Sequence, residues 1–402
     1  MTPAFTSIEA ARRLAARRLP PAVYGYIDGG KEAEQTAVAN ELAFSRVLFS
    51  PRIGTGIIKA DTSVELFGER MKMPVVIAPT GMIRIVHRDG ELGAARAAAG
   101  AGIPIAISHV CGEPARAVVA ENSATWFQLY FIGGRDAVRQ SLELARDAGC
   151  RVLVVTVDVG AVAPRDRIAR VLPTRLNLQS AFAFLPEAWN RPRWLATFLS
   201  GGLAMPAPNA PRKSDGSELT LAELGKMIGS SAPSWSDLEW LRSQWDGALV
   251  IKGVLRVDDA RRAAEIGANA ISVSNHGAKV LDGTPSALSV LPEIVDAVGD
   301  RLDVLLDGGV RRGADVVRAC ALGAKAVFIG RPYLWGLAAA GEQGVADVLS
   351  LFQAGISATL VGLGCESIAA LDRSYLRPLP DTSAWNEVGA AHLERLWGRS
   401  PT

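Results

Sequence analysis

Short apolar runs alternate with amphipathic stretches along most of this chain. Runs of roughly four to eight residues rich in Val, Ile and Leu predict buried strands, and apolar residues spaced three and four apart predict helices. The runs that fit the strand pattern are Met73–Ala78, Ile103–Ile107, Thr125–Tyr130, Arg151–Asp158, Ala248–Lys252, a run starting at Ile271, Asp303–Asp307 and Ala326–Gly330. Helical patterns between them cover Glu91–Ala99, Pro114–Ala120, Asp136–Ala148, Val257–Ile266, Leu288–Val298 and Ala314–Leu322.

This alternation predicts an α/β fold with a parallel sheet covered on both faces. Eight strand-and-helix units favour a closed (β/α)8 TIM barrel, whose chemistry lies at the carboxyl ends of the strands. The competing fold, an open doubly wound sheet, carries a glycine fingerprint after its first strand, and Pro79-Thr80-Gly81 is not one. We therefore expect one domain over residues 1–402. Within it, 1–72 is an N-terminal helical segment and 160–246 a long insertion after the fourth strand that forms a lid.

Composition and charge exclude several other classes of protein. With 402 residues, 49% of them apolar, and a net charge of +2, the chain can bury a large core but lacks the positive charge of a nucleic-acid binder. It has no uncharged apolar run of the length that spans a membrane and no apolar stretch near its N-terminus, so we expect neither a membrane span nor a signal peptide. Its four cysteines lie far apart without metal-ligand spacing. We expect a cytoplasmic protein with reduced thiols, no metal site and a small-molecule substrate.

Polar residues follow nearly every predicted strand. Any one of them could simply cap a loop, but that interpretation does not explain so many at the same end of the strands. In a barrel these side chains gather in one site. They are Pro79 with Thr80, Ser108, Gln128 with Tyr130, Thr156 with Asp158, Lys252, Ser274-Asn275-His276, Asp307-Gly308-Gly309, and Gly330-Arg331.

The last two strands are followed by glycines and arginines, in the segments Asp307–Gly313 and Ile329–Pro332. Barrel enzymes hold phosphate groups at this place. Glycines let backbone N–H groups approach an anion, and arginines such as Arg311 and Arg331 add positive charge. The two segments predict a phosphorylated ligand, most simply a cofactor.

Taken together, these motifs resemble the FMN-dependent α-hydroxy-acid oxidases and dehydrogenases, a family that includes glycolate oxidase, lactate oxidase and mandelate dehydrogenase. The resemblance extends from about Ser7 to Leu371. Its motifs are Leu19–Tyr26, Ala78–Thr80, Trp126–Tyr130, Thr156–Asp158, Ile251–Gly253, Ser274–Gly277, Leu281-Asp282, Asp307–Arg311 and Gly330–Pro332. The spacer segments Arg191–Trp194 and Gly336–Gly364 look most similar to the flavoprotein subgroup that acts in mycofactocin maturation.

The resemblance implies an FMN cofactor. Because relatives are commonly tetramers, it also implies a homotetramer. The implied FMN contacts are Pro79, Thr80, Ser108, Gln128, Thr156, Lys252 and Ser274, with the phosphate near Asp307, Gly309, Arg311, Gly330 and Arg331. Among these, Lys252 matches the residue whose positive charge stabilises the reduced flavin ring.

For catalysis, the resemblance implies that His276 is the base and that Asp158 stabilises its protonated form. A base that takes up a proton in a dry pocket needs a nearby carboxylate, which gives this pair a physical reason. Tyr26 and Tyr130 match the phenols that hydrogen-bond the substrate, and Arg165 matches one of two guanidiniums that bind its carboxylate.

The second of those guanidiniums is replaced in this chain by Lys279, three residues after His276. Lysine keeps the charge but not the planar fork, so a small 2-hydroxy acid would be held less rigidly. Three functions therefore stay open: oxidation of an L-2-hydroxy acid, oxidation of a larger hydroxy or amino compound such as a peptide-derived amide, and flavin binding without turnover. Retention of His276, Asp158 and Lys252 argues against the last, because a binding protein needs none of them.

Overall fold

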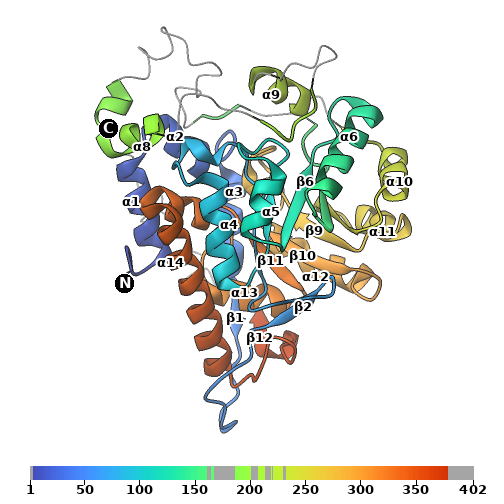
Figure 1. The fold of residues 1–402 in the computed structure, drawn as a ribbon. Coiled ribbons are helices and arrows are strands. Elements are labelled where there is room, and N and C mark those ends of the chain that lie inside the picture. The colour runs from blue at the N-terminus through green and yellow to red at the C-terminus, as the bar shows by residue number, and fades with distance from the viewer. Residues whose placement is uncertain are drawn as a thin grey trace.

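Eight parallel strands form a closed barrel in this computed structural model, which describes residues 3–160, 164–166, 186–200, 207–212, 219, 221–229 and 232–378. They run around the barrel in chain order and close where β11 pairs with β4 (Figure 1). The strands are β4 (Val75–Ile77), β5 (Ile105–Ile107), β6 (Thr125–Leu129), β7 (Val152–Thr156), β8 (Ala248–Val254), β9 (Ala270–Ser274), β10 (Asp303–Asp307) and β11 (Ala326–Ile329). The predicted (β/α)8 barrel is confirmed, and each predicted strand is present.

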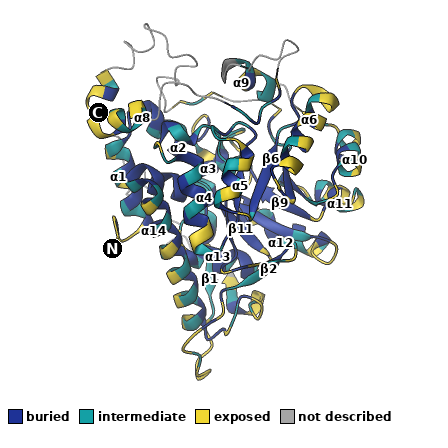
Figure 2. Cartoon of the chain, viewed as in Figure 1, coloured by how far each residue is buried: buried dark blue, intermediate teal, exposed yellow. Residues whose placement is uncertain are grey.

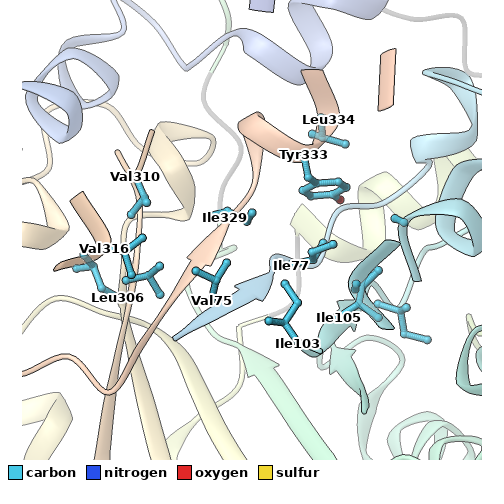
Figure 3. Close-up of a cluster of buried hydrophobic side chains, with 14 of the residues drawn as sticks. Val75, Ile77, Ile103, Ile105, Leu306, Val310, Val316, Ile329, Tyr333 and Leu334 are labelled. Carbon is cyan, nitrogen blue, oxygen red and sulfur yellow. The ribbon is translucent and has the colours of Figure 1, made fainter. Parts of the chain in front are cut away.

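Helices cover the outside of the barrel. They are α4 (Gly90–Ala101), α5 (Ala115–Glu121), α6 (Gly134–Asp147), α11 (Val257–Glu265), α12 (Ala287–Val298), α13 (Gly313–Ala321) and α14 (Arg331–Leu363), and each predicted helix is among them. Outward-facing strand residues such as Val75, Ile77 and Ile329 pack against the helical layer (Figure 3). Because successive strand residues alternate in direction, the residues between them point inward.

Those inward residues form a second core inside the barrel, which includes Val76, Trp126 and Phe328. The hairpin of β2 (Val64–Leu66) and β3 (Glu69–Met71) joins this core, and Phe67 at its turn lies 5.5 Å from the Trp126 ring. Apolar side chains therefore fill the barrel from its amino end, and the polar residues collect at the carboxyl ends of the strands.

Three N-terminal helices pack onto the barrel: α1 (Ile8–Arg18), α2 (Pro21–Asp28) and α3 (Gln35–Ser45). Ser7 caps α1, the Pro20-Pro21 pair separates α1 from α2, and Arg12 of α1 forms a buried ion pair with Asp28 of α2 at 3.0 Å. Helix α1 packs on α14, and α3 packs on α12. A small sheet of β1 (Val47–Phe49) and β12 (Leu376–Pro378) joins the segment after α3 to the C-terminal end of the described chain. The expected N-terminal helical segment is present.

The insertion expected at 160–246 lies partly outside the described residues. Its described parts include α8 (Pro192–Ser200), α9 (Leu221–Gly229) and α10 (Trp235–Gln244). The Trp194 indole of α8 donates a hydrogen bond of 2.8 Å to the carbonyl of Ile85, which fixes α8 to the segment after β4. Figure 1 shows α8 and α9 at the end of the molecule opposite β2 and β12.

Helix α14 is, within the described part of the chain, the one helix long and apolar enough to cross a membrane. Its buried residues include Tyr333, Trp335, Val348 and Phe352, and it packs against α1, α4 and α13 (Figure 2). The helical path is broken at Ala340-Gly341. Of its most apolar window, 44% is buried within the protein.

Candidate active site

His276 lies in a tight turn that follows β9. Asn275 caps the turn, which forms η2 (His276–Ala278), and its side chain accepts a hydrogen bond from the N–H of Ala278. The His276 imidazole contacts the Asp158 carboxylate through Nδ1, at 2.9 Å from Oδ1. Asp158 stands two residues after the end of β7, so the pair joins two strand ends of the barrel.

Opposing effects act on the pKa of Asp158. Burial raises it, but the positive charges of His276 and Lys252 lower it more, so the pKa of this carboxyl group lies below its usual value. Its second oxygen, Oδ2, is buried and has no hydrogen-bond partner among the described residues. An ionised Asp158 stabilises an imidazolium at His276.

A second charged group, formed by Lys252, Ser274 and Asp307, extends across β8, β9 and β10. The Lys252 ammonium of β8 lies 2.6 Å from Asp307 of β10, and Ser274 of β9 accepts a hydrogen bond from Lys252 and donates one to Asp307. Burial lowers the pKa of Lys252, but Asp307 and Asp158 raise it above its usual value. The barrel mouth therefore holds a positive charge at neutral pH.

Gln128 at the end of β6 has an unused donor. Its Oε1 accepts hydrogen bonds from the Ser108 hydroxyl at 3.1 Å and from the His109 N–H at 3.2 Å. Its Nε2 is buried without a partner among the described residues. Because an unpaired buried donor is costly, this amide points to an acceptor supplied by a ligand. Thr156 is buried on β7 in register with Lys252, and Pro79-Thr80 follow β4.

Two of the glycines expected near a phosphate, Gly309 and Gly330, differ in the space around them. Gly330 precedes α14, and a Cβ atom added there would meet only the Ala78 Cβ, at 3.9 Å. Gly309 has a φ of +81°, and a Cβ there would lie 2.1 Å from the Asn40 carbonyl oxygen. The open space thus lies at Gly330, beside the N-terminus of a long helix, where anions bind well. Gly309 instead allows the barrel to pack closely against α3.

The two arginines of these segments contact protein groups. Arg311 forms an ion pair with Glu41 of α3 at 2.8 Å. Arg331 donates hydrogen bonds to the carbonyls of Asp28, Gly29 and Gly277. Both therefore lie at the expected end of the barrel, with side chains engaged by the N-terminal helices and the turn after β9.

The residues expected to bind substrate come together around Tyr26 of α2. The Tyr26 hydroxyl donates to the carbonyl of Gly81 at 3.0 Å, and the Arg165 guanidinium lies 5.7 Å from the centre of its ring. Burial raises the pKa of Tyr26 and, more strongly, that of Tyr130, whose pKa is raised further by Asp158 and by Tyr26. Tyr130 thus shares its surroundings with both Asp158 and Tyr26, and both phenols stay protonated at neutral pH.

Lys279 is close to Tyr26 but contacts its backbone. The ammonium donates hydrogen bonds to the carbonyls of Tyr26 at 2.8 Å and Gly29 at 3.0 Å, at the C-terminal end of α2. A positive charge there complements the helix dipole. Lys279 therefore has a structural role in addition to the substrate contact expected for it.

Comparison with known proteins identifies the family. A protein-family model described as FMN-dependent dehydrogenase matches residues 15–378, most of the chain. This chain belongs to the FMN-dependent dehydrogenase family. It is 44% identical to pre-mycofactocin synthase of Mycolicibacterium smegmatis, over 90% of this chain and 92% of that protein. It is 40% identical to L-lactate dehydrogenase of Alcaligenes faecalis, over 91% and 97% of the two chains. A crystal structure of the monotopic membrane protein (S)-mandelate dehydrogenase superposes with a TM-score of 0.86, at 34% identity, covering 93% of this chain and 99% of that one.

The site of this FMN-dependent dehydrogenase fits its cofactor. The unpaired Gln128 amide would serve as a donor for a flavin carbonyl, the Lys252 ammonium would suit an electron-rich ring edge, and the space at Gly330 would suit a phosphate. Ser108, Thr156 and Ser274 are buried at or directly after the ends of β5, β7 and β9. The enzyme is an FMN-dependent oxidoreductase.

Two buried residues beside this flavoenzyme site, His109 and Lys31, are not assigned to it by the sequence. His109 is fully buried, its Nδ1 accepts a hydrogen bond from the Tyr130 N–H, and burial lowers its pKa to about 4, so it is a neutral support for Tyr130. Lys31 follows a Gly-Gly turn and is also buried. A single lysine in a turn predicts an exposed side chain, and the burial of Lys31 follows only from its tertiary surroundings. Within the described part of the chain, no three His, Cys, Asp or Glu side chains are grouped to hold a metal.

Proposed function

We propose that this flavoenzyme oxidises L-2-hydroxy acids to 2-oxo acids, with His276 as the base. The observation that carries the proposal is the 2.9 Å contact between His276 and Asp158 in the site that also contains Tyr26, Tyr130 and Arg165. It combines a base with protonated phenols and a cation, the groups needed to bind and oxidise a hydroxy acid. L-lactate dehydrogenase and (S)-mandelate dehydrogenase among the similar proteins support this substrate class.

The protonation states follow from the contacts. An ionised carboxylate only accepts hydrogen bonds, so the Nδ1 of His276 carries the hydrogen that faces Asp158. This leaves Nε2 with its lone pair available to take a proton from the substrate. As the proton arrives, the imidazole becomes positively charged and Asp158 stabilises it.

Oxidation removes two electrons and two protons from the hydroxy acid. Bound FMN supplies the acceptor for the two electrons. His276 takes one proton and the other is lost with the two electrons to the bound FMN, and the same geometry serves whether the proton taken by His276 leaves the carbon or the hydroxyl group. Lys252 keeps a positive charge beside the acceptor position, and Tyr26 and Tyr130 donate hydrogen bonds that orient the substrate, whose carboxylate Arg165 binds.

A second candidate function is oxidation of a larger hydroxy or amino compound, such as a peptide-derived amide. Two observations favour it. The Lys279 ammonium is held by the carbonyls of Tyr26 and Gly29, and a relative at 44% identity is named pre-mycofactocin synthase. Such a substrate has no carboxylate, so it would not depend on the cations around Tyr26.

Anaerobic mixing of the yellow holoenzyme with candidate substrates separates the two functions. Lactate, glycolate, mandelate and longer 2-hydroxy acids are each added, with amides and amines of similar size in parallel, and flavin absorbance is followed. Rapid bleaching by a hydroxy acid supports the first function. Bleaching by the amides or amines alone supports the second. If only a chemical reductant bleaches the flavin, neither holds and the protein binds FMN without turnover.

The family resemblance also leads us to propose a homotetramer located in the cytoplasm. Light scattering on the purified holoenzyme measures the oligomeric state, and a monomer would contradict the first expectation. Cell fractionation tests the second, with particular interest because one structural neighbour is described as a monotopic membrane protein.

A further inference from the structure

His276 lies in a turn whose backbone conformation is uncommon. Three successive residues have positive φ angles, +56° at His276, +60° at Gly277 and +64° at Ala278. Residues with a Cβ atom disfavour this left-handed region, because the Cβ atom comes too close to a backbone carbonyl oxygen. A histidine and an alanine in this conformation are strained, and such strain persists only where surrounding contacts hold the backbone. The contacts that hold this turn therefore set the position of the imidazole.

Asn275, the residue before the turn, is bound by Asn40 of α3. The two side-chain amides exchange hydrogen bonds of 2.8 Å, since each Nδ2 donates to the Oδ1 of the other. Both residues are buried, and a Cβ atom added at Gly308 would lie 3.3 Å from the Nδ2 of Asn40 and 3.4 Å from the Oδ1 of Asn275. The two asparagines are 235 positions apart in the chain, so the pair links the N-terminal helices to the turn that carries His276.

Backbone groups on both sides fix the direction in which each amide faces. The Oδ1 of Asn275 also accepts a hydrogen bond from the Ala278 N–H, and the Oδ1 of Asn40 accepts one from the Ala287 N–H, each at 3.3 Å. The Nδ2 of Asn275 donates a second hydrogen bond, of 3.0 Å, to the Pro285 carbonyl. Turning either amide over would place donor against donor among buried groups, which is costly. The pair thus has one arrangement, and the turn is held in the backbone conformation that suits it.

Other groups hold the end of the turn. Arg331 donates a hydrogen bond of 2.8 Å to the carbonyl of Gly277, and the Lys31 N–H donates one of 3.0 Å to the carbonyl of Ala278. These contacts fix the peptide groups that follow the imidazole. Asn40 differs from them, because it acts through Asn275 on the residue that precedes the imidazole. The turn is therefore held from both of its ends.

We infer that Asn40 is a positioning residue for His276. By pairing with Asn275, it holds the strained turn in the orientation in which the Nδ1 of His276 faces the Asp158 carboxylate at 2.9 Å. The inference rests on the proposed function, which makes His276 the base, and deepens it by assigning part of the control over the base to helix α3. Asn40 takes no part in substrate binding or in proton transfer. Its substitution should slow proton transfer and leave binding nearly unchanged.

The test compares Asn40→Ala and Asn40→Asp with the matched control Thr36→Val. Thr36 lies one turn earlier on α3 and is also buried, and its hydroxyl group donates to the Thr284 carbonyl and accepts from the Thr284 N–H. The control therefore removes a buried contact between the same helix and the segment after the turn, while the asparagine pair is kept. Thermal melting and flavin content show that each variant is folded and loaded, with Asn40→Ser as a second truncation if Asn40→Ala is not.

Each holoenzyme is mixed anaerobically with the 2-hydroxy acid that reduces the wild-type flavin fastest. Asn40→Ala should lower kcat by about ten- to a hundredfold with little change in KM, because a small displacement of a catalytic group slows the reaction more than it weakens binding. Asn40→Asp keeps an acceptor for the Asn275 amide, so its kcat should lie between those of the wild type and Asn40→Ala. Thr36→Val should retain the kcat of the wild type.

Crystal structures of the wild-type and variant holoenzymes give a result that is independent of turnover. In Asn40→Ala the imidazole of His276 should be displaced from Asp158 or distributed over several positions, whereas in Thr36→Val it should keep its contact with the carboxylate. An imidazole that stays in place in Asn40→Ala would overturn the assignment, whatever the rate. A kcat equal to that of the wild type, or an equal loss in Thr36→Val, would also overturn it.

The same experiments separate this inference from the proposed function. If the wild-type enzyme is reduced by none of the hydroxy acids, the proposed function fails, and the position of the imidazole in Asn40→Ala alone decides whether Asn40 positions His276. If the wild-type enzyme oxidises a hydroxy acid while Asn40→Ala keeps both its kcat and its imidazole position, the proposed function stands and the inference about Asn40 fails.

Discussion

The two halves of the active site are built in different ways. In the proton-transfer half, Lys252 lies on β8, and Asp158 and His276 lie within two residues of the ends of β7 and β9, strands whose register is fixed by backbone pairing. The anion-binding half, with Tyr26 and Arg165, stands on an N-terminal helix and a segment after β7. Side chains on strands keep their relative positions because moving one strand disturbs the whole barrel. Side chains on helices and loops packed over its mouth can be exchanged without that cost, so specificity changes there while the chemistry is retained.

Removal of the base is expected to have the largest effect. His276→Ala should lower kcat for a hydroxy acid by about 10³-fold, within the usual range for general-base catalysis. FMN content should be unchanged, because the flavin contacts lie on other residues. Anaerobic reduction rates and the flavin-to-protein absorbance ratio measure both. Loss of flavin together with activity would mean that His276 holds the cofactor and does not act as the base.

Asp158→Asn is expected to lower kcat by about 10²-fold, since an amide cannot stabilise an imidazolium as a carboxylate does. The variant also gives a pH test of stability. Because the pKa of Asp158 lies below its usual value in the fold, its stabilising effect is present above about pH 4 and is lost as pH falls through the folded pKa. Thermal melting from pH 3 to 7 should therefore show a wild-type advantage at neutral pH that shrinks in acid. An advantage independent of pH would contradict an ionised Asp158.

Two glycine substitutions separate phosphate binding from packing in the segments after β10 and β11. Gly330→Ala places a methyl group in open space beside α14 and should weaken FMN binding about tenfold while leaving the melting of the apoprotein nearly unchanged. Gly309→Ala places it against the Asn40 carbonyl at a positive φ and should lower the free energy of unfolding by about 2 kcal/mol or more. FMN titration and denaturant unfolding distinguish the two. Unchanged FMN affinity in Gly330→Ala would place the phosphate elsewhere.

The smallest effect is expected for Lys279→Met. The variant loses the hydrogen bonds to the carbonyls of Tyr26 and Gly29, which should lower the free energy of unfolding by about 1 kcal/mol. Denaturant unfolding measures this loss. A rise in KM for the acid with unchanged stability would assign Lys279 to substrate binding and not to the end of α2.

The sequence predicts the barrel well because its strands and helices have strong periodicity. β10 matches its predicted bounds at both ends, and β11 differs by one residue. The short strands β1, β2 and β3 have three residues each, too few for a recognisable pattern.

The site, too, is predictable where it depends on the barrel strands and not where it depends on other packing. Barrel register brings Ser274 beside Asp307, and Thr156 beside Lys252, so residues predicted at strand ends do meet. The side-chain partners of Arg311 and Arg331 depend on how α2 and α3 pack over the barrel, which is a non-local property. Lys31 gives no periodic signal, and its burial is set by segments far along the chain.

Arg331 bonds with one guanidinium to Asp28 and Gly29 at the end of α2 and to Gly277 beside the imidazole. It thus connects the C-terminal end of α2, the turn that carries His276 and the start of α14. Side chains around Arg331 can be substituted, but the length of the turn after α2 cannot be changed. A single residue inserted between Gly29 and Lys31 would displace the base as surely as it altered substrate choice. Engineering of new selectivity in this scaffold should therefore exchange residues and leave the spacing of the turn alone.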